Sequence, residues 1–348
     1  MTLLEITNWV QSRTAVLEYD NDSIHLYSHP HSKDQELKCL WVANTSKRMF
    51  KTGDIASDMK KGLQPYMPKK HCNKKAFIKD YENKDNWRLQ WGLDQNSISV
   101  HYKDKLIAVM PEWSGHEGFW GYSIGVSDET DIAWPLNDGN EQIKRITSEQ
   151  VFLDNWSDSD WVELQEGVMG KYKNSMRGDN RYFAGDGGNW PPLGIHYCKN
   201  AEQELISTIG MSILPMPLLG MNFENPEPYR KIELAIIFEN ARDGLPLASY
   251  ISGQATYPWS FGTHFNHGHT IPCSQLEEAG SDMSFMLILE TANFLPEISL
   301  NQPNTRLLFM LPIYESEQVY IEKNGSSDFL SLMEDHQKPL DLKRQPVV

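Results

Sequence analysis

The stretch LLFMLPIYESEQVYIEKNGSSDFLSLM, residues 307–333, joins an apolar run to two segments of helical composition. The apolar run occupies residues 305–314, and near-continuous apolar runs are typical of strands that are covered on both faces. Gly325 then divides the polar remainder into two predicted helices, because glycine commonly ends a helix. We expect these helices to turn the following side chains at least partly toward the core: Val319, Tyr320, Ile321, Phe329, Leu330 and Met333.

Outward from this stretch, the second half of the chain alternates apolar runs with polar turns. Residues 193–198 and 204–214 predict a β-hairpin, and residues 231–238 predict a buried strand. Residues 281–291 form a further apolar run. Strands of this kind, interspersed with helices, predict an α+β fold with mixed, mainly antiparallel sheets and flanking helices.

The first half of the chain also consists of short strand-like runs. Residues 36–44 have β-type composition, and residues 88–113 predict a small meander. The basic stretch PKKHCNKK, residues 68–75, is an exception in an acidic chain. We interpret it as a solvated loop rather than a binding patch.

A helical region lies between the two halves, and its N-caps are readable from the sequence. Thr147 or Ser148 is the predicted cap of a first segment, and Ser157 or Asp158 is that of a second. After it, residues 173–192 are rich in Gly, Asn, Asp and Pro, as linkers and functional loops are. We therefore predict two domains, residues 1–178 and residues 179–348.

Composition limits the classes of partner. The 348 residues carry a net charge of −15 at pH 7, which argues against nucleic acid and suits a partner with a basic surface. The four cysteines are scattered without a CxxC motif, so reduced thiols are expected. The N-terminal residues lack the features of a signal peptide, and the longest apolar run, near residues 283–289, is too short to span a bilayer. We expect a cytoplasmic protein without a membrane partner.

One short motif raises the possibility of a serine hydrolase. GYSIG, residues 121–125, matches the G-x-S-x-G pattern, with Ser123 as the nucleophile. That motif requires a strand before the serine and a helix after it, whereas the flanking residues here are loop-like and contain Trp134-Pro135. The sequence therefore favours a glycine-rich loop, and the hydrolase is kept as an alternative function.

A second motif raises the possibility of a metal site. THFNHGHTI, residues 263–271, contains His264, His267 and His269, and imidazole is the commonest metal ligand. On a regular strand, alternation places His264 on the face opposite the other two. The pattern favours a polar strand or loop whose histidines bond to the backbone, with a metal-dependent enzyme as the alternative.

Several segments resemble the suppressor of fused-like family. Residues 307–333 resemble its closing signature, PYRKIELAIIF (228–238) its central Glu-Leu strand, and ELISTIGMS (204–212) its strand that ends in Gly-Met/Val-Ser. GHTIP (268–272) is similar to the turn that precedes its next core strand. Upstream, WSGHEGFWGY (113–122), IAWPL (132–136) and GDGGNWPP (185–192) look like landmarks of two-part bacterial members.

The resemblance implies protein binding without catalytic residues, metal or cofactor. Its animal member sequesters a transcription factor by gripping an extended peptide, and bacterial members are thought to include immunity proteins. For this chain it implies neutralisation or sequestration of a partner protein, with a toxin as the leading case, and the acidic charge suits a toxin with a basic surface. The candidate partner-binding residues are Trp113, His116, Asp186, Asn189, Trp190, His264 and His267. GDGGNWPP is equally consistent with a purely structural corner, and protonation of His264 and His267 near neutral pH would tune a partner contact.

Overall fold

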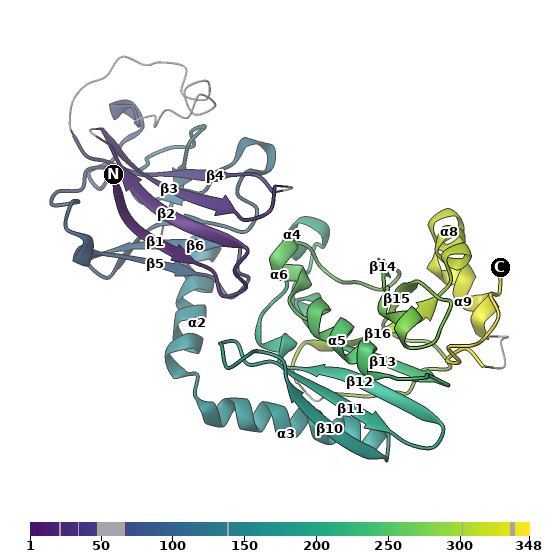
Figure 1. Cartoon of the computed structure of the whole chain (residues 1–348). Coiled ribbons are helices and arrows are strands. Elements are labelled where there is room, and N and C mark those ends of the chain that lie inside the picture. The colour runs from purple at the N-terminus through teal and green to yellow at the C-terminus, as the bar shows by residue number, and fades with distance from the viewer. Residues whose placement is uncertain (21, 34, 47–66, 138, 301, 335–337) are drawn as a thin grey trace. The chain divides into compact units, whose positions relative to one another are not determined.

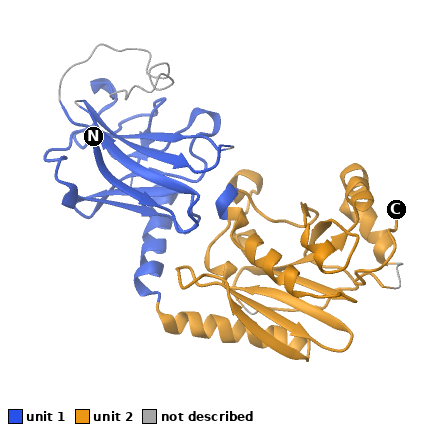
Figure 2. Ribbon diagram, viewed as in Figure 1, with its two compact units in different colours: residues 1–156, 259–262 blue, residues 157–258, 263–348 orange. Residues whose placement is uncertain are grey.

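The computed structural model describes residues 1–20, 22–33, 35–46, 67–137, 139–300, 302–334 and 338–348. These residues form two compact units (Figure 2). Unit 1 comprises Met1–Trp156 and Trp259–Gly262, and unit 2 comprises Ser157–Pro258 and Thr263–Val348. The domain limits at residues 178 and 179 stay a prediction.

Unit 1 contains two sheets in its described residues. An antiparallel sheet has the order β1-β2-β3-β4, and a second sheet has the order β5-β6-β7-β8-β9 with only its last pair parallel. The first sheet is formed by β1 (Thr2–Thr7), β2 (Arg13–Tyr19), β3 (Ser23–Pro30) and β4 (Lys38–Asn44). The second is formed by β5 (Trp87–Trp91), β6 (Ile98–Tyr102), β7 (Lys105–Met110), β8 (Tyr122–Ser123) and β9 (Trp134–Pro135). Short 3-10 helices are η1 (Lys69–His71), η2 (Lys84–Asn86) and η3 (His116–Gly118).

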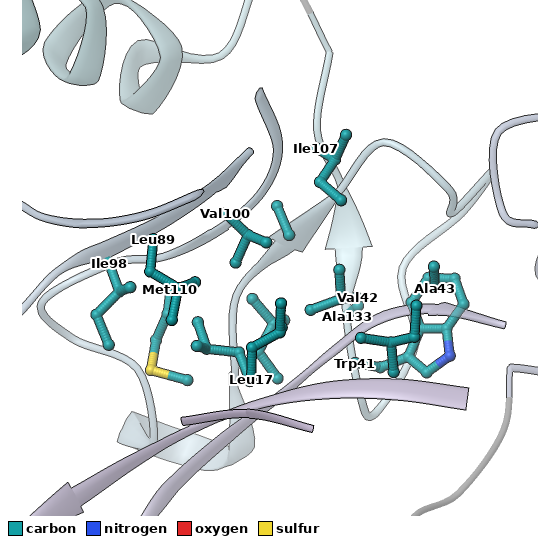
Figure 3. Packing of buried hydrophobic residues seen from close by; sticks show 14 of the residues in the cluster. Leu17, Trp41, Val42, Ala43, Leu89, Ile98, Val100, Ile107, Met110 and Ala133 are labelled. Atoms are coloured by element: carbon teal, nitrogen blue, oxygen red, sulfur yellow. The ribbon is translucent and has the colours of Figure 1, made fainter. Parts of the chain in front are cut away.

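The core of unit 1 is made by side chains from both sheets. Leu17 and Trp41 from the first sheet belong to one buried cluster with Ile98, Val100 and Met110 from the second (Figure 3). Trp41 is fully buried, and its indole N–H donates to the Asn44 side chain at 2.9 Å, which satisfies its polar atom. The predicted strand at 36–44 and the predicted meander at 88–113 are confirmed by β4 and by β5 to β7.

The helix α2 (Glu141–Asn155) begins earlier than the sequence predicts. The Asn140 side chain caps it by accepting from Gln142 N at 2.8 Å. Thr147 and Ser148 are inside the helix, where their hydroxyls donate to backbone carbonyls one turn back at 2.8 Å. The prediction that either of them caps the helix is wrong, because α2 already has a cap and their side chains serve the helix interior.

Unit 2 is built on a seven-stranded sheet of the order β10-β11-β12-β13-β16-β15-β14 (Figure 1). Its pairs are antiparallel except β13-β16. The strands are β10 (Asp179–Ala184), β11 (Gly194–Lys199), β12 (Gln203–Ile209), β13 (Lys231–Glu239), β14 (Thr270–Pro272), β15 (Phe285–Leu289) and β16 (Thr305–Ile313). The sheet confirms the predicted hairpin, the buried strand and the two apolar runs. Together with the helices, it makes the protein an α+β fold, as predicted.

Helices cover both faces of this sheet. The helix α3 (Asp158–Ser175) begins after Ser157, which confirms the predicted cap, and contributes Val168 and Tyr172 to the same buried cluster as α8 and α9. The helix α5 packs on β11, β12 and β13 from the opposite side of the sheet (Figure 1). The other helices of unit 2 are α4 (Leu219–Asn222), α5 (Leu245–Gln254), α7 (Gln275–Glu278), α8 (Glu315–Asn324) and α9 (Ser326–Glu334), with 3-10 turns η4 (Met211–Ile213) and η5 (Glu227–Tyr229). The short helix α6 (Tyr257–Phe261) is divided, since its residues from Trp259 onward belong to unit 1.

Gly325 separates α8 from α9 as predicted, with a positive φ of 91°. Ile321, Phe329 and Met333 are buried, whereas Val319 is 56% exposed, so its inward placement is wrong. Three consecutive residues cannot share one face, because each helical residue turns by roughly 100°.

The helices in the described ranges are all too short or too polar to span a bilayer.

Candidate protein-binding site

Strand β10 is an exposed edge of the seven-stranded sheet. It pairs with β11 and with no other described strand, and all six of its residues are exposed. The composition of residues 173–192 predicts a linker or functional loop, and that prediction is wrong for residues 179–184, which form β10. The segment contains Tyr182 and Phe183, which favour strands, but its polar flanks hide the signal.

The hydrogen bonds show which backbone groups of β10 face outward. Gly185 N donates to Leu193 O at 2.7 Å, which continues the β10-β11 ladder by one residue. Because inward and outward groups alternate along an antiparallel strand, the N–H and C=O groups of Asn180, Tyr182 and Ala184 point away from β11. These groups are unpaired within the described part of the chain and form a template for another strand.

One face of β10 is held by side chains from α3 and β11. The Tyr182 ring lies over Gly194, where an added Cβ would come within 2.4 Å of a ring carbon. Asn180 Oδ1 lies 2.8 Å from Nε2 of His196, whose ring stacks on Tyr172 at 5.6 Å between centroids. Burial, followed by the nearby Lys173 charge, lowers the pKa of His196 to about 4. A neutral imidazole therefore anchors the edge strand at neutral pH.

The other face of β10 borders an apolar hollow of about 270 Å³. Phe183 and Leu245, which stand at its rim, are 39% and 42% exposed. Its remaining lining residues are Ala184, Ile195, Ala248, Ser249 and Ser252, from β10, β11 and α5. A strand added to β10 would direct alternate side chains toward this hollow.

The loop between β10 and β11 contains three of the predicted partner-binding residues. Asp186 accepts from Gly188 N at 2.6 Å and from Leu193 N at 3.0 Å, so its carboxylate holds the loop closed. Asn189 is exposed, and its side-chain amide donates to Asp186 O at 3.1 Å. Trp190 is half-buried before a cis peptide bond to Pro191. These contacts give Asp186 a structural role beside the edge, while Asn189 keeps accessible surface.

The three histidines lie at the start of β14, the other edge strand of the sheet. The rings of His264 and His269 are 5.5 Å apart between centroids, and His264 also meets the ring of Phe223 at 5.8 Å. His267 faces elsewhere, with Nδ1 accepting from Glu290 N at 3.2 Å. Burial lowers the pKa of His264 and of His269, so both protonate at a more acidic pH than free imidazole. Across the described residues, no group of three His, Cys, Asp or Glu side chains is arranged to hold a metal ion.

The remaining predicted residues belong to unit 1. Trp113 and His116 lie in the turn after β7, with His116 exposed and Trp113 half-buried. Ser123 is fully buried on β8, where its hydroxyl donates to Val42 O at 2.8 Å and accepts from Gly125 N at 3.1 Å. A nucleophilic serine needs a neighbouring base to take its proton, and here a backbone carbonyl occupies that place.

All four cysteines are free thiols, as predicted. Cys39, Cys198 and Cys273 are buried, and burial raises the pKa of Cys273 to about 12. Thiols in such surroundings are poor nucleophiles, because the thiolate is the reactive form.

Comparisons with known proteins match the second part of the chain. A family model described as Suppressor of fused protein (SUFU) matches residues 189–345. Similar solved structures include a suppressor of fused homolog from Neisseria gonorrhoeae, with 16% identity over 54% of this chain and 98% of that chain and a TM-score of 0.42. They also include the Sufu-Fu complex, with 12% identity over 54% of this chain and 91% of that chain and a TM-score of 0.40.

Drosophila Suppressor of Fused is similar at 10% identity over 52% of this chain and 50% of that chain, with a TM-score of 0.36. No curated protein matches the sequence. The family match begins after β10, so it contains β11 to β16 but not the edge strand itself. Residues 189–345 of this chain therefore match the suppressor of fused family model.

Proposed function

We propose that this chain is a non-enzymatic protein-binding protein that takes an extended segment of its partner onto the free edge of β10. The observation that supports this proposal is the set of backbone N–H and C=O groups that point away from β11 at Asn180, Tyr182 and Ala184. They lie beside the hollow that Phe183 lines. In such strand addition, backbone pairing supplies affinity and a side-chain pocket supplies specificity. The family match of residues 189–345 supports a protein partner.

Ala184→Pro is expected to weaken partner binding by about tenfold or more, because it removes one backbone hydrogen bond and adds a ring where the incoming strand must pair. The N–H of Ala184 points away from β11, so proline leaves the existing ladder intact. Ala184→Ser keeps the N–H and is the matched control. Binding of the purified partner is measured by isothermal titration calorimetry. Equal affinities for the two variants would contradict strand addition at β10.

A photo-crosslinking amino acid identifies the partner and tests the location in one experiment. Benzoylphenylalanine at Phe183 is expected to crosslink a protein in cells, because this side chain borders the hollow. The same group at Val162, which is 48% exposed on α3, is the control. A protein captured equally at both positions, or at neither, would count against this site.

We further propose that the partner is a toxin with a basic surface, which the net charge of −15 would attract. A toxin encoded beside this gene is expected to arrest growth when expressed alone and to be harmless beside the unchanged chain. Ala184→Pro is expected to protect poorly, and Ala184→Ser is expected to protect fully. If the crosslinked partner is harmless to cells when expressed alone, the protein-binding role stands and the immunity role is wrong.

A further inference from the structure

Unit 1 contains a hollow of about 1120 Å³ whose described lining is strongly basic. Asp80 is its one acidic residue among those described. The lysines that line it are Lys69, Lys74, Lys75, Lys79, Lys103 and Lys105, and all six are exposed. This concentration of positive charge stands out in a chain whose net charge is −15.

Two segments that are distant in the sequence supply these charges. Lys69, Lys74 and Lys75 come from the basic stretch 68–75, for which the sequence predicts a solvated loop, and Lys79 follows it. Lys103 comes from the turn between β6 and β7, where it has a positive φ of 48°, and Lys105 is the first residue of β7. The tertiary structure thus brings the lysines of two sequence segments together around one hollow, and we call these six lysines the lysine rim.

The floor of the hollow is apolar. Ile107 is only 4% exposed, and Phe77, Ile78 and Ile124 pack against the core cluster of unit 1 while lining the hollow. These side chains are less exposed than the six lysines. A ligand that fills the hollow must therefore carry negative charge for the rim and apolar groups for the floor.

None of the six ammonium groups forms an ion pair within the described residues. Lys103 instead lies over the Tyr102 ring, 5.3 Å from its centroid. Like charges gathered within one Debye length repel each other, and a bound anion would relieve that repulsion.

We propose that this lysine-rimmed hollow binds an acidic peptide segment with interspersed apolar side chains, supplied by a protein partner. The proposal is independent of strand addition at β10, because it concerns other residues in the other unit. Carboxylates of the peptide pair with the lysine rim, and its aliphatic or aromatic side chains pack on Ile78, Ile107 and Ile124.

The chemistry of the hollow favours a peptide over nucleic acid or a membrane. Its described lining contains no arginine, the residue whose planar fork suits phosphate. Tyr102, the ring best placed for base stacking, is already covered by Lys103 and by Trp87 at 4.8 Å. Membrane-binding surfaces expose apolar side chains, whereas Ile107 is buried and Ile78 and Ile124 are partly buried here.

Fluorescence anisotropy on the full chain tests the proposal with defined probes. The main probe is a labelled peptide of repeated Glu-Glu-Leu triplets, compared with an all-glutamate peptide and an oligothymidylate of the same length. Vesicles of phosphatidylserine are the fourth probe, followed by sedimentation. The triplet peptide is expected to bind most tightly, with an affinity that falls as salt rises.

Lys75→Glu combined with Lys79→Glu is expected to weaken the triplet peptide about tenfold or more, because two favourable charges become repulsive. The control combines Lys33→Glu with Lys84→Glu, two exposed lysines of unit 1 that do not line the hollow. It makes the same change in net charge and is expected to change affinity less than about threefold, since neither lysine lines the hollow and exposed charges are screened by salt.

Ile78→Ala is expected to weaken binding of the triplet peptide and to leave the all-glutamate peptide unchanged. Circular dichroism confirms that each variant is folded. Equal losses in both double variants, tighter binding of the oligothymidylate or the vesicles, or the absence of binding by the triplet peptide would each overturn the proposal. None of these results depends on the partner of β10, so the two proposals fail separately.

Discussion

Glu317→Ala is expected to lower the free energy of unfolding of unit 2 by about 3–5 kcal/mol, because it leaves the Arg344 charge buried without a partner. The two side chains are fully buried and form a bidentate pair, with Arg344 Nη1 and Nη2 donating to Glu317 at 2.5 and 2.7 Å. The same carboxylate accepts from Val347 N at 3.0 Å and from Tyr314 N at 2.9 Å. It therefore joins the end of β16 and the first turn of α8 to the last residues of the chain.

The measurement is urea unfolding of the full chain, with hydrogen exchange of residues 305–324 assigning the transition to unit 2. Glu315→Ala is the control, since Glu315 is an exposed carboxylate in the same first helical turn. It is expected to cost less than about 1 kcal/mol, through the helix dipole alone. The double variant of Glu317 and Arg344 to alanine is expected to cost less than the sum of the single variants, because it removes both charges. Equal costs for Glu315→Ala and Glu317→Ala would show that the pair does not stabilise this unit.

Glu233→Ala is expected to destabilise unit 2 by about 3–5 kcal/mol, because it orphans several buried donors that each cost roughly 1–3 kcal/mol when left unsatisfied. Glu233 is fully buried on β13. One oxygen accepts from Gly210 N, Ser212 N and the Ser212 hydroxyl at 3.0, 3.0 and 2.6 Å, and the other accepts from the Thr208 hydroxyl at 2.6 Å. Gly210 has a φ of 103°, a conformation that glycine adopts readily.

Glu233→Gln is the matched variant and is expected to cost much less than Glu233→Ala. Its carbonyl can accept the three bonds from residues 210 and 212, and its amide can donate to the Thr208 hydroxyl, which can turn toward Leu234 O at 3.4 Å.

Burial raises the pKa of Glu233, so the folded state holds the proton more tightly than the unfolded state does. The stability that this proton adds is present below the unfolded pKa and is lost as pH rises through the folded pKa. The unfolding free energy of the unchanged protein should therefore fall relative to that of Glu233→Gln as pH rises from about 4.5, and a pH-independent difference would contradict the raised pKa.

These two hydrogen-bond networks join segments that carry the family resemblance in the sequence. The Glu-Leu strand and the Gly-Met-Ser segment are far apart in the chain, yet Glu233 bonds to both Gly210 and Ser212. The acidic helix start in residues 307–333 contains Glu317, whose partner Arg344 lies beyond that stretch. These segments are recognisable in the sequence, but the hydrogen bonds between them are visible only in the folded chain.

The candidate site was much less predictable than the core. The sequence predicts partner-binding residues beside β10, namely Asp186, Asn189 and Trp190. It does not indicate Tyr182 and Phe183, because a single exposed strand has no apolar periodicity. The first three strands of unit 1 were not assigned either, although β2 alternates buried and less buried residues over Arg13–Tyr19. Residue type does not follow that alternation, because the buried positions include Arg13 and the less buried ones include Val16.

The sequence by itself determined the buried strands of unit 2, the break between α8 and α9 at Gly325, and the match of residues 189–345 to the suppressor of fused family model. These features depend on runs of apolar residues and on the conformational freedom of glycine, which act over a few neighbouring positions. Three features became visible only in the tertiary structure. Strand β10 is an edge of its sheet, the Ser123 hydroxyl donates to the backbone carbonyl of Val42, and the lysines of two segments line one hollow. Each of these outcomes depends on contacts between residues that are distant in the chain, and local patterns carry no record of such contacts.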